Sequence, residues 1–363
     1  MTKTVLVAGA SGLVGYGAIK HFGVQPNTKV IAVSRRVPED LWHAKHVKLD
    51  LMDAADCRAQ AFRFSEVTHL VYAALHELPG LVEGWQNDEQ IRINDQMLRN
   101  LLEPLIEAAP DLRHVTLLQG TKAYGVHVRP MRVPAREGRS EMREQPNFYW
   151  AQEDYLRARQ ADEKWHWTIL RPVLVVGEAI GGAMNLIPAL GVFAAMMRNQ
   201  SDTLPFPGGG PRISQAVDAD LLARAIAWAG EAESARNDTF NVTNGDVFVW
   251  EHIWPAIAEA CGMKPGPSTP FPLNVLAEGG AMGWNLLRRH HGLRAPGLAD
   301  FVGQSFEYAD YQLRYGHPEP GPASIVSTVK INQAGFHETM DTEFMFPKWF
   351  KVFQDRGLLP KVK

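Results

Sequence analysis

Cysteine is scarce in this chain. Its 363 residues include only Cys57 and Cys261, and neither belongs to a Cys-x-x-Cys pair or a cysteine–histidine cluster. His43 and His46 are close in sequence but have no third candidate ligand beside them. Because disulfide frameworks and metal centres are built from such clusters, we expect neither, and the scarcity favours a reducing compartment.

An excess of charge of one sign is also lacking. Lysine and arginine total 37 against 40 acidic residues, which gives a formal net charge of −3. Nucleic-acid-binding domains usually carry a basic excess, so no nucleic-acid partner is expected. The short basic run at residues 288–291 is interpreted as a solvated helix face.

No apolar run is long enough to span a bilayer. The longest, residues 183–197, is interrupted by Asn185 and Pro188 and is shorter than the roughly 18 residues of a membrane span. We interpret it as a buried or pocket-lining helix. No charged leader with a hydrophobic segment precedes the first strand-like run, so the sequence predicts a cytoplasmic protein without a membrane partner.

What the chain does contain is an alternation of strand-like and helical segments. Residues 90–108 have helical apolar spacing and end before Pro110, as a crossover helix should. The strand-like runs are residues 4–8, 30–34, 69–73, 114–118 and 167–176. This alternation is typical of α/β folds, and it predicts a Rossmann-type, doubly wound parallel sheet.

The alternation breaks down after Gly177 into turns rich in glycine and proline, and helical patterns return at residues 219–229 and 250–261. A chain of this length usually forms a main domain with a smaller companion. We expect a cofactor-binding domain and a smaller C-terminal substrate-binding lobe. Residues 1–177 and 213–243 are assigned to the former, and residues 178–212 and 244–363 to the latter.

Three glycines separate the first strand-like run from the first helical one. In this context a glycine turn lets backbone N–H groups and the helix N-terminus face a pyrophosphate at close range. The turn therefore predicts a dinucleotide cofactor. The residues expected to hold it are Gly9, Ser11, Gly12, Leu13, Val14 and Gly15.

The end of the second strand indicates which dinucleotide binds. An NAD enzyme places an acidic residue there, whereas this chain has Ser34, Arg35 and Arg36. Two guanidinium groups and a hydroxyl suit a 2′-phosphate, which predicts NADP(H). Further cofactor contacts are expected where later strands end, at Asp50, Leu51, Ala73, Ala74, Gln119, Gly120, Pro172 and Val173.

The candidate catalytic residues depart from a common pattern. Ordinary short-chain dehydrogenases use Tyr-x-x-x-Lys on a helix with a serine from an earlier strand end. Here Glu153 stands four residues after Tyr149, and Gly120 stands where the serine is expected. Lys122 follows the fifth strand and could supply the missing cation from the other side.

These residues resemble the progesterone 5β-reductase and iridoid synthase-like enzymes, an atypical branch of the extended short-chain dehydrogenases. The matching stretches are residues 119–124, 146–154, 170–172, 240–248 and 330–336. The resemblance implies NADPH-dependent reduction of a carbon–carbon double bond conjugated to a carbonyl, with Tyr149 and Lys122 catalytic, and it makes a homodimer plausible. The plant enzymes' Gly-Pro-Phe is replaced by residues 125–128, so their substrates do not carry over.

Physical chemistry agrees with this assignment. Hydride addition to the β-carbon creates an enolate, and a preorganised donor at its oxygen commonly contributes about 10²–10³ in rate. Tyr149 can donate without ionising, Lys122 would strengthen that donation and hold the nicotinamide ribose, and solvent can supply the last proton. The expected substrate is a small hydrophobic enone or carbonyl compound.

Three alternatives remain open at this point. A carbonyl reductase could use the same residues for 1,2-reduction. A nucleotide-sugar epimerase or dehydratase shares the architecture but normally needs the Tyr-x-x-x-Lys pair that Glu153 interrupts. A regulator could bind NADPH without catalysis.

Overall fold

The computed structural model describes residues 3–78 and 84–362. The chain divides into two compact units. The first consists of Met1–Val173, Asp220–Val242 and Val326–Glu338, and the second of Leu174–Ala219, Thr243–Ile325 and Thr339–Lys363.

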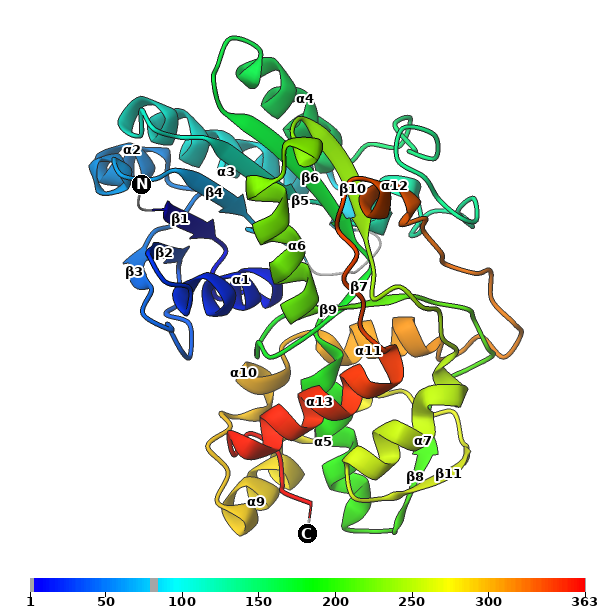
Figure 1. Ribbon diagram of the computed structural model, residues 1–363. Helices are drawn as coiled ribbons and strands as arrows, with labels where there is room; N and C mark the ends of the chain where they lie inside the picture. The colour runs from blue at the N-terminus through cyan, green and yellow to red at the C-terminus, as the bar shows by residue number, and fades with distance from the viewer. Residues whose placement is uncertain (1–2, 79–83, 363) are drawn as a thin grey trace. The chain divides into compact units, whose positions relative to one another are not determined.

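A seven-stranded sheet forms the centre of the first unit (Figure 1). Its strands are β1 (Lys3–Ala8), β2 (Thr28–Ser34), β3 (Lys45–Lys48), β4 (His69–Tyr72), β5 (His114–Leu118), β6 (His166–Pro172) and β10 (Asp238–Val242). They lie in the order β10-β6-β5-β4-β1-β2-β3, and every pair is parallel. The order reverses between β1 and β4. The prediction of a doubly wound Rossmann sheet is therefore confirmed.

Helices cover both faces of this sheet, α1 (Leu13–Gly23) and α6 (Ala219–Glu231) on one and α2 (Ala54–Gln60), α3 (Asp88–Ala108) and α4 (Phe148–Gln160) on the other (Figure 1). The predicted crossover helix is α3. Its apolar stripe packs into a core with the strands because residues three and four apart share one helix face. Short 3-10 turns complete the unit at Ala61–Phe64, Gly84–Gln86, Thr121–Tyr124 and Glu233–Ala235.

The strand-like run at residues 167–176 is divided in the structure. β6 ends at Pro172, and β7 (Leu174–Val176) pairs instead with β9 (Ala216–Asp218) in the second unit. Proline lacks an N–H group for the ladder, which accounts for the break. β3 escaped the sequence analysis because its four residues include two lysines and only one fully buried side chain, Val47.

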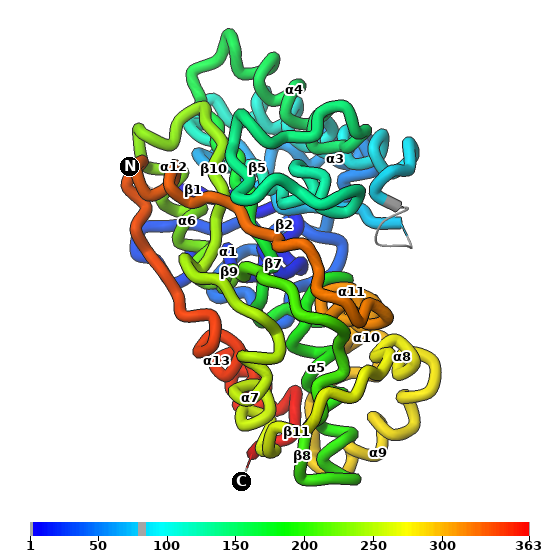
Figure 2. The backbone as a smooth tube through the Cα atoms, turned by 90° about the vertical axis from the view of Figure 1, so that its right-hand side faces the viewer, coloured from blue at the N-terminus to red at the C-terminus, as the bar shows by residue number. Residues whose placement is uncertain are grey.

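The segment Val326–Glu338, which the sequence analysis placed in the C-terminal lobe, packs in the first unit. The backbone N–H of Ser327 donates to the carbonyl of Ala135 at 2.8 Å, and the Phe336 ring lies 5.7 Å from that of Trp228. This segment carries α12 (Val329–Gln333), which lies beside β10 (Figure 2). Such contacts join residues far apart in sequence, so local patterns do not reveal them.

The second unit is built around α5 (Leu186–Arg198), whose residues 186–195 are all buried. This confirms the predicted buried helix, which begins after its N-cap Asn185 with Pro188 in its first turn. The other elements are β8 (Thr203–Phe206), α7 (Trp250–Ala260), β11 (Lys264–Ser268), α8 (Val275–Gly279), α9 (Ala281–His291), α10 (Leu298–Val302), α11 (Ser305–Leu313) and α13 (Thr342–Asp355). Among the helices of the described residues, none combines the length and apolar character needed to cross a membrane.

Candidate active site

The predicted cofactor residues gather at one edge of the sheet. Each group follows the carboxyl end of a parallel strand, from the turn after β1 to the end of β6. Ligands of open α/β sheets bind at this edge, near the point where the strand order reverses. The structure thus brings the predicted residues of the first unit to a common edge.

The glycine turn requires its glycines for close backbone approach. Gly9 has φ +81°, and a Cβ there would lie 2.7 Å from the backbone of Ala73 and Ala74. A Cβ on Gly15 would lie 2.2 Å from the carbonyl oxygen of Gly9. A tight turn therefore packs β1 and α1 directly against the end of β4.

The N-terminus of α1 is left without a side-chain cap. Its N-cap is Gly12, and no acidic residue stands in the first turn. Five other helices have side-chain caps, namely Asp53 for α2, Asn87 for α3, Asn147 for α4, Asn185 for α5 and Asp341 for α13. A helix start on which no side-chain cap competes for the backbone N–H groups suits a pyrophosphate, and the turn therefore fits a dinucleotide.

Two solvent-exposed arginines follow the end of β2. Arg35 and Arg36 are exposed, and neither makes an ion pair within residues 3–78 and 84–362. The hydroxyl of buried Ser34 donates to the carbonyl of Arg36 at 2.6 Å and lies 3.2 Å from Nε2 of His46. The guanidinium groups are thus available to an anion. Sequence reasoning did not connect His46 with Ser34, because the two residues lie twelve positions apart.

The phenol of Tyr149 lies at the carboxyl end of β5. Asn147 caps α4 by accepting from the N–H of Tyr149 at 3.0 Å, which fixes the start of the helix. A Cβ on Gly120 would lie 3.3 Å from the phenolic oxygen. A side chain at this position would be in tight contact with the phenol, which glycine avoids.

Lys122, in the 3-10 turn after β5, shares an aromatic partner with Tyr149. Its Nζ lies 3.5 Å from the centroid of the Trp85 ring, and the Tyr149 ring lies 5.4 Å from the same ring in an edge-on arrangement. The Trp85 indole N–H donates to Glu77 at 3.1 Å. The groups around this ring, here called the Trp85 cluster, are Glu77, Trp85, Lys122, His127, Phe148 and Tyr149.

Burial sets the protonation of both candidate catalytic groups. It lowers the pKa of Lys122 to about 7, against the opposing effect of the Glu77 carboxylate. Burial, reinforced by Glu77, raises the pKa of Tyr149, so its phenol stays protonated at neutral pH. The site therefore offers a neutral O–H donor and a cation that exchanges its proton near neutrality. Sequence reasoning missed Glu77 and Trp85, because nothing in their spacing links them to Lys122.

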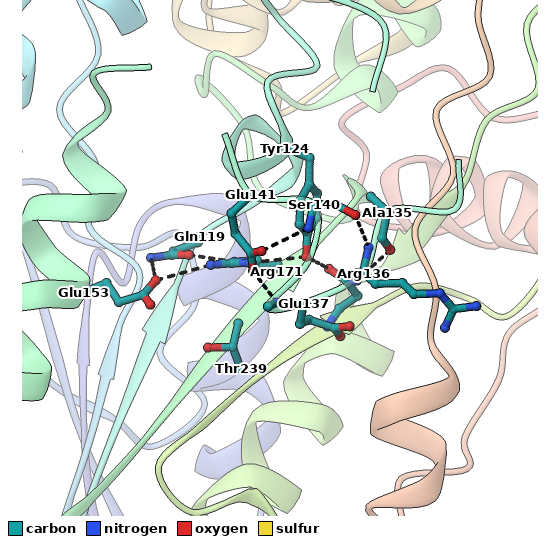
Figure 3. Close-up of polar contacts among 12 residues, drawn as sticks. Gln119, Tyr124, Ala135, Arg136, Glu137, Ser140, Glu141, Glu153, Arg171 and Thr239 are labelled. Atoms are coloured by element: carbon teal, nitrogen blue, oxygen red, sulfur yellow. Dashed lines mark hydrogen bonds and ion pairs between the residues drawn. The ribbon is translucent and has the colours of Figure 1, made fainter. Parts of the chain in front are cut away.

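A second group of polar side chains, here called the Arg171 cluster, includes Arg171 of β6 and Gln119, which follows β5 (Figure 3). The Arg171 side chain is only 1% exposed and pairs with Glu141 at 2.6 Å and Glu153 at 3.2 Å. Its Nε donates to Gln119 at 2.8 Å, and Nη1 lies 3.3 Å from the hydroxyl of Tyr124. The members of the cluster are Gln119, Tyr124, Glu141, Glu153 and Arg171.

This cluster explains the acidic residue in place of the usual lysine. Glu153 faces Arg171, and Gln119 links the two by donating to Glu153 at 3.4 Å and to the backbone carbonyl of Tyr149 at 3.2 Å. The side chain of Gln119 is thereby engaged, and its backbone N–H donates to the carbonyl of Leu170 at 2.9 Å. Within the described ranges no group of three potential metal ligands occurs, and both cysteines are buried free thiols.

Comparisons with known proteins agree with this geometry. The chain matches the family described as PRISE-like Rossmann-fold domain over residues 50–309. It is 33% identical over 286 residues to a 3-oxo-Delta(4,5)-steroid 5-beta-reductase of Arabidopsis thaliana, covering 72% of this chain and 70% of that one. It is 30% identical over 318 residues to an (S)-8-oxocitronellyl enol synthase of Nepeta racemosa, covering 82% and 80%.

Solved structures extend the likeness of fold to more distant proteins. UDP-glucose 4-epimerase of Thermotoga maritima superposes with a TM-score of 0.66 at 16% identity, covering 97% of this chain and 99% of that one. UDP-glucose 4-epimerase of Brucella ovis, solved with NAD, gives 0.65 at 18% identity, covering 96% and 97%. The family match and the relatives confirm the resemblance seen in the motifs: the chain belongs to the PRISE-like Rossmann-fold family.

Proposed function

We propose that the protein is an NADPH-dependent reductase of carbon–carbon double bonds conjugated to a carbonyl group. The observation that carries this proposal is the packing of the Tyr149 phenol and the Lys122 ammonium against the same Trp85 ring, beside the end of β5. The steroid 5-beta-reductase relative supports it, since that name describes reduction beside a 3-oxo group.

The first unit would hold the cofactor through the glycine turn, the uncapped start of α1 and the two exposed arginines. Bound NADPH would supply a hydride to the β-carbon of the substrate. Arg35 and Arg36 would select its 2′-phosphate, because charge-assisted bonds from guanidinium groups are strong and bidentate. Replacing both by serine is expected to lower the preference for NADPH over NADH about tenfold or more, measured as a ratio of kcat/KM values.

The chain's own residues would stabilise the product of that transfer. Electron density moves to the carbonyl oxygen as the β-carbon is reduced, and Tyr149 would donate its O–H to this oxygen. Its raised pKa keeps the proton on the phenol, so it acts as a donor. The positive charge of Lys122 favours the enolate, and solvent protonates the α-carbon.

The position of the deuterium after transfer tests this reaction. Purified protein is incubated with 2-cyclohexen-1-one and NADPH deuterated at C4 of the nicotinamide, and the product is analysed by mass spectrometry and NMR. We expect cyclohexanone labelled at the β-carbon. An allylic alcohol labelled at the carbinol carbon would instead identify a carbonyl reductase. An epimerase would need a lysine four residues after Tyr149, where this chain has Glu153, which pairs with Arg171.

A further inference from the structure

The buried imidazole of His127 stands out among the polar side chains of residues 3–78 and 84–362. The residue is 9% exposed, and among the described residues no hydrogen-bonding group reaches its Nδ1 or Nε2. Buried polar groups are almost always paired, so such a side chain calls for an explanation. Another buried imidazole shows the usual arrangement: Nδ1 of His69 lies 2.8 Å from the Thr68 hydroxyl, and Nε2 lies 3.3 Å from the Gly230 carbonyl.

His127 belongs to the Trp85 cluster. Its ring centroid lies 6.4 Å from that of Trp85, the same indole that contacts Lys122 and Tyr149. Burial and the neighbouring Lys122 charge lower the pKa of the imidazole to about 4. The ring is therefore neutral at physiological pH and presents one N–H donor and one acceptor nitrogen.

The single donor and single acceptor of the neutral ring limit which ligand groups could hydrogen-bond to it. A purely hydrocarbon substrate would leave both nitrogens unpaired, at a cost in free energy. A carboxylate could use only the single N–H, and it would lie near the Glu77 carboxylate on the same indole. A hydroxyl both accepts and donates, and a carbonyl oxygen accepts from the N–H, so a neutral oxygen group fits best.

We propose that His127 binds a second oxygen function of the substrate, a hydroxyl or carbonyl remote from the conjugated double bond. The natural substrate is then an enone or enal that carries a second oxygen group, rather than one whose remaining part is only hydrocarbon. This inference rests on the proposed function, in which Tyr149 takes the first oxygen. It makes His127 a specificity-determining residue.

Matched substrates test the assignment. The linear 2-enals trans-2-hexenal, trans-2-octenal and trans-2-decenal are compared with their counterparts bearing a hydroxyl on the last carbon. In at least one pair, the wild-type kcat/KM is expected to favour the hydroxylated compound about tenfold or more. His127→Phe should reduce that ratio to about one, and His127→Gln, which keeps a donor and an acceptor, should restore part of it.

A control variant shows whether the change in substrate preference is specific to His127 or follows from losing any imidazole. His166→Phe removes a ring at the amino end of β6, away from the carboxyl edge, and should leave the ratio unchanged. Thermal melting of each variant identifies any that fail to fold. Equal ratios in wild type and His127→Phe, or a preference for an enal ending in a carboxylate, would overturn the proposal.

A binding measurement keeps the proposal testable apart from turnover. The protein with NADP⁺ is titrated with a saturated hydroxy-aldehyde that cannot be reduced at carbon–carbon bonds, and the ¹⁵N resonances of the His127 ring are followed by NMR. A shift of these resonances that the unhydroxylated analogue does not produce is expected. If no enal is reduced but the shift occurs, the proposed reaction fails while the binding site stands, whereas unmoved resonances contradict the site itself.

Discussion

Two polar clusters at the same edge of one sheet differ in how completely their charges are paired. In the Arg171 cluster, the guanidinium is bound by two carboxylates, an amide oxygen and a hydroxyl. In the Trp85 cluster, Lys122 lies against a ring with no ion pair among the described residues, and His127 has no hydrogen-bond partner there. Both clusters are buried at the same sheet edge, but within the described residues the pairing by hydrogen bonds and ion pairs seen in the Arg171 cluster has no counterpart at Lys122 and His127.

This difference in pairing indicates which cluster stabilises the fold and which is suited to binding and reaction. Breaking a fully paired buried network leaves charges uncompensated, so such a network stabilises the fold and holds its parts in register. Groups left unpaired cost stability and persist where a ligand or a reaction uses them. The Arg171 cluster therefore positions α4 and the end of β5, whereas in the proposed function the unpaired groups of the Trp85 cluster serve the cofactor and the substrate.

The largest effect is expected from removing the centre of the paired cluster. Arg171→Met removes the buried guanidinium from Glu141 and leaves Glu153 paired only with the partly exposed Arg143 and Arg157. It should lower the free energy of unfolding by about 3–5 kcal/mol in urea titrations. Arg157→Met is the matched control, because Arg157 also pairs with Glu153 but its side chain is 46% exposed. Its loss should cost less than about 1 kcal/mol. Equal costs would show that the burial of Arg171 adds nothing.

The next effect concerns the open cluster. Tyr149→Phe removes the donor to the developing enolate and should lower kcat about 10²–10³-fold with little change in the melting temperature. Tyr155→Phe is the control on the same helix, where the hydroxyl donates to Glu103 at 2.7 Å, away from the Trp85 cluster. It should leave kcat unaltered. A kcat for Tyr149→Phe within about twofold of wild type would remove the phenol from the reaction.

The sequence was sufficient for five of the seven strands, all but β3 and β10, because the information for those five is local. Buried strands such as β1 carry a continuous apolar run, Val5–Ala8, and the glycine turn marks the β1–α1 junction within seven residues, Gly9–Gly15. Gly120 and Glu153 were recognised as departures from a familiar pattern. What replaced that pattern was not visible in the sequence.

The rest of the site depends on contacts between distant residues. Trp85 reaches Lys122 from before α3, and Arg171 joins Glu141 and Glu153 across separate elements. No spacing rule connects such residues, because the fold alone brings them together. Arg171 was seen only as part of a shared Leu-Arg-Pro motif, and its role became visible with its partners.

A smaller effect on stability would sharpen the contrast between the clusters. The pKa of Lys122 is lowered from 10.5 to about 7, so the unfolded chain binds this proton more tightly than the folded chain. The ammonium therefore costs stability at neutral pH. Lys122→Met should keep the free energy of unfolding within about 1 kcal/mol of wild type or raise it, while slowing enone reduction. A loss as large as that of Arg171→Met would mean that the ammonium is structural.

The smallest expected effect is a gradual dependence of kcat/KM on pH. Lys122 carries its charge below a pKa of about 7, so the charged fraction decreases as the pH rises through that value. The value of kcat/KM for NADPH reports ionisations of the free enzyme and should fall by about half at the pKa and about tenfold for each further unit. Lys122→Met should lack this inflection, because it has no proton to lose. If the variant keeps the inflection, another group is responsible, and the unpaired charge of the Trp85 cluster would have no part in the reaction.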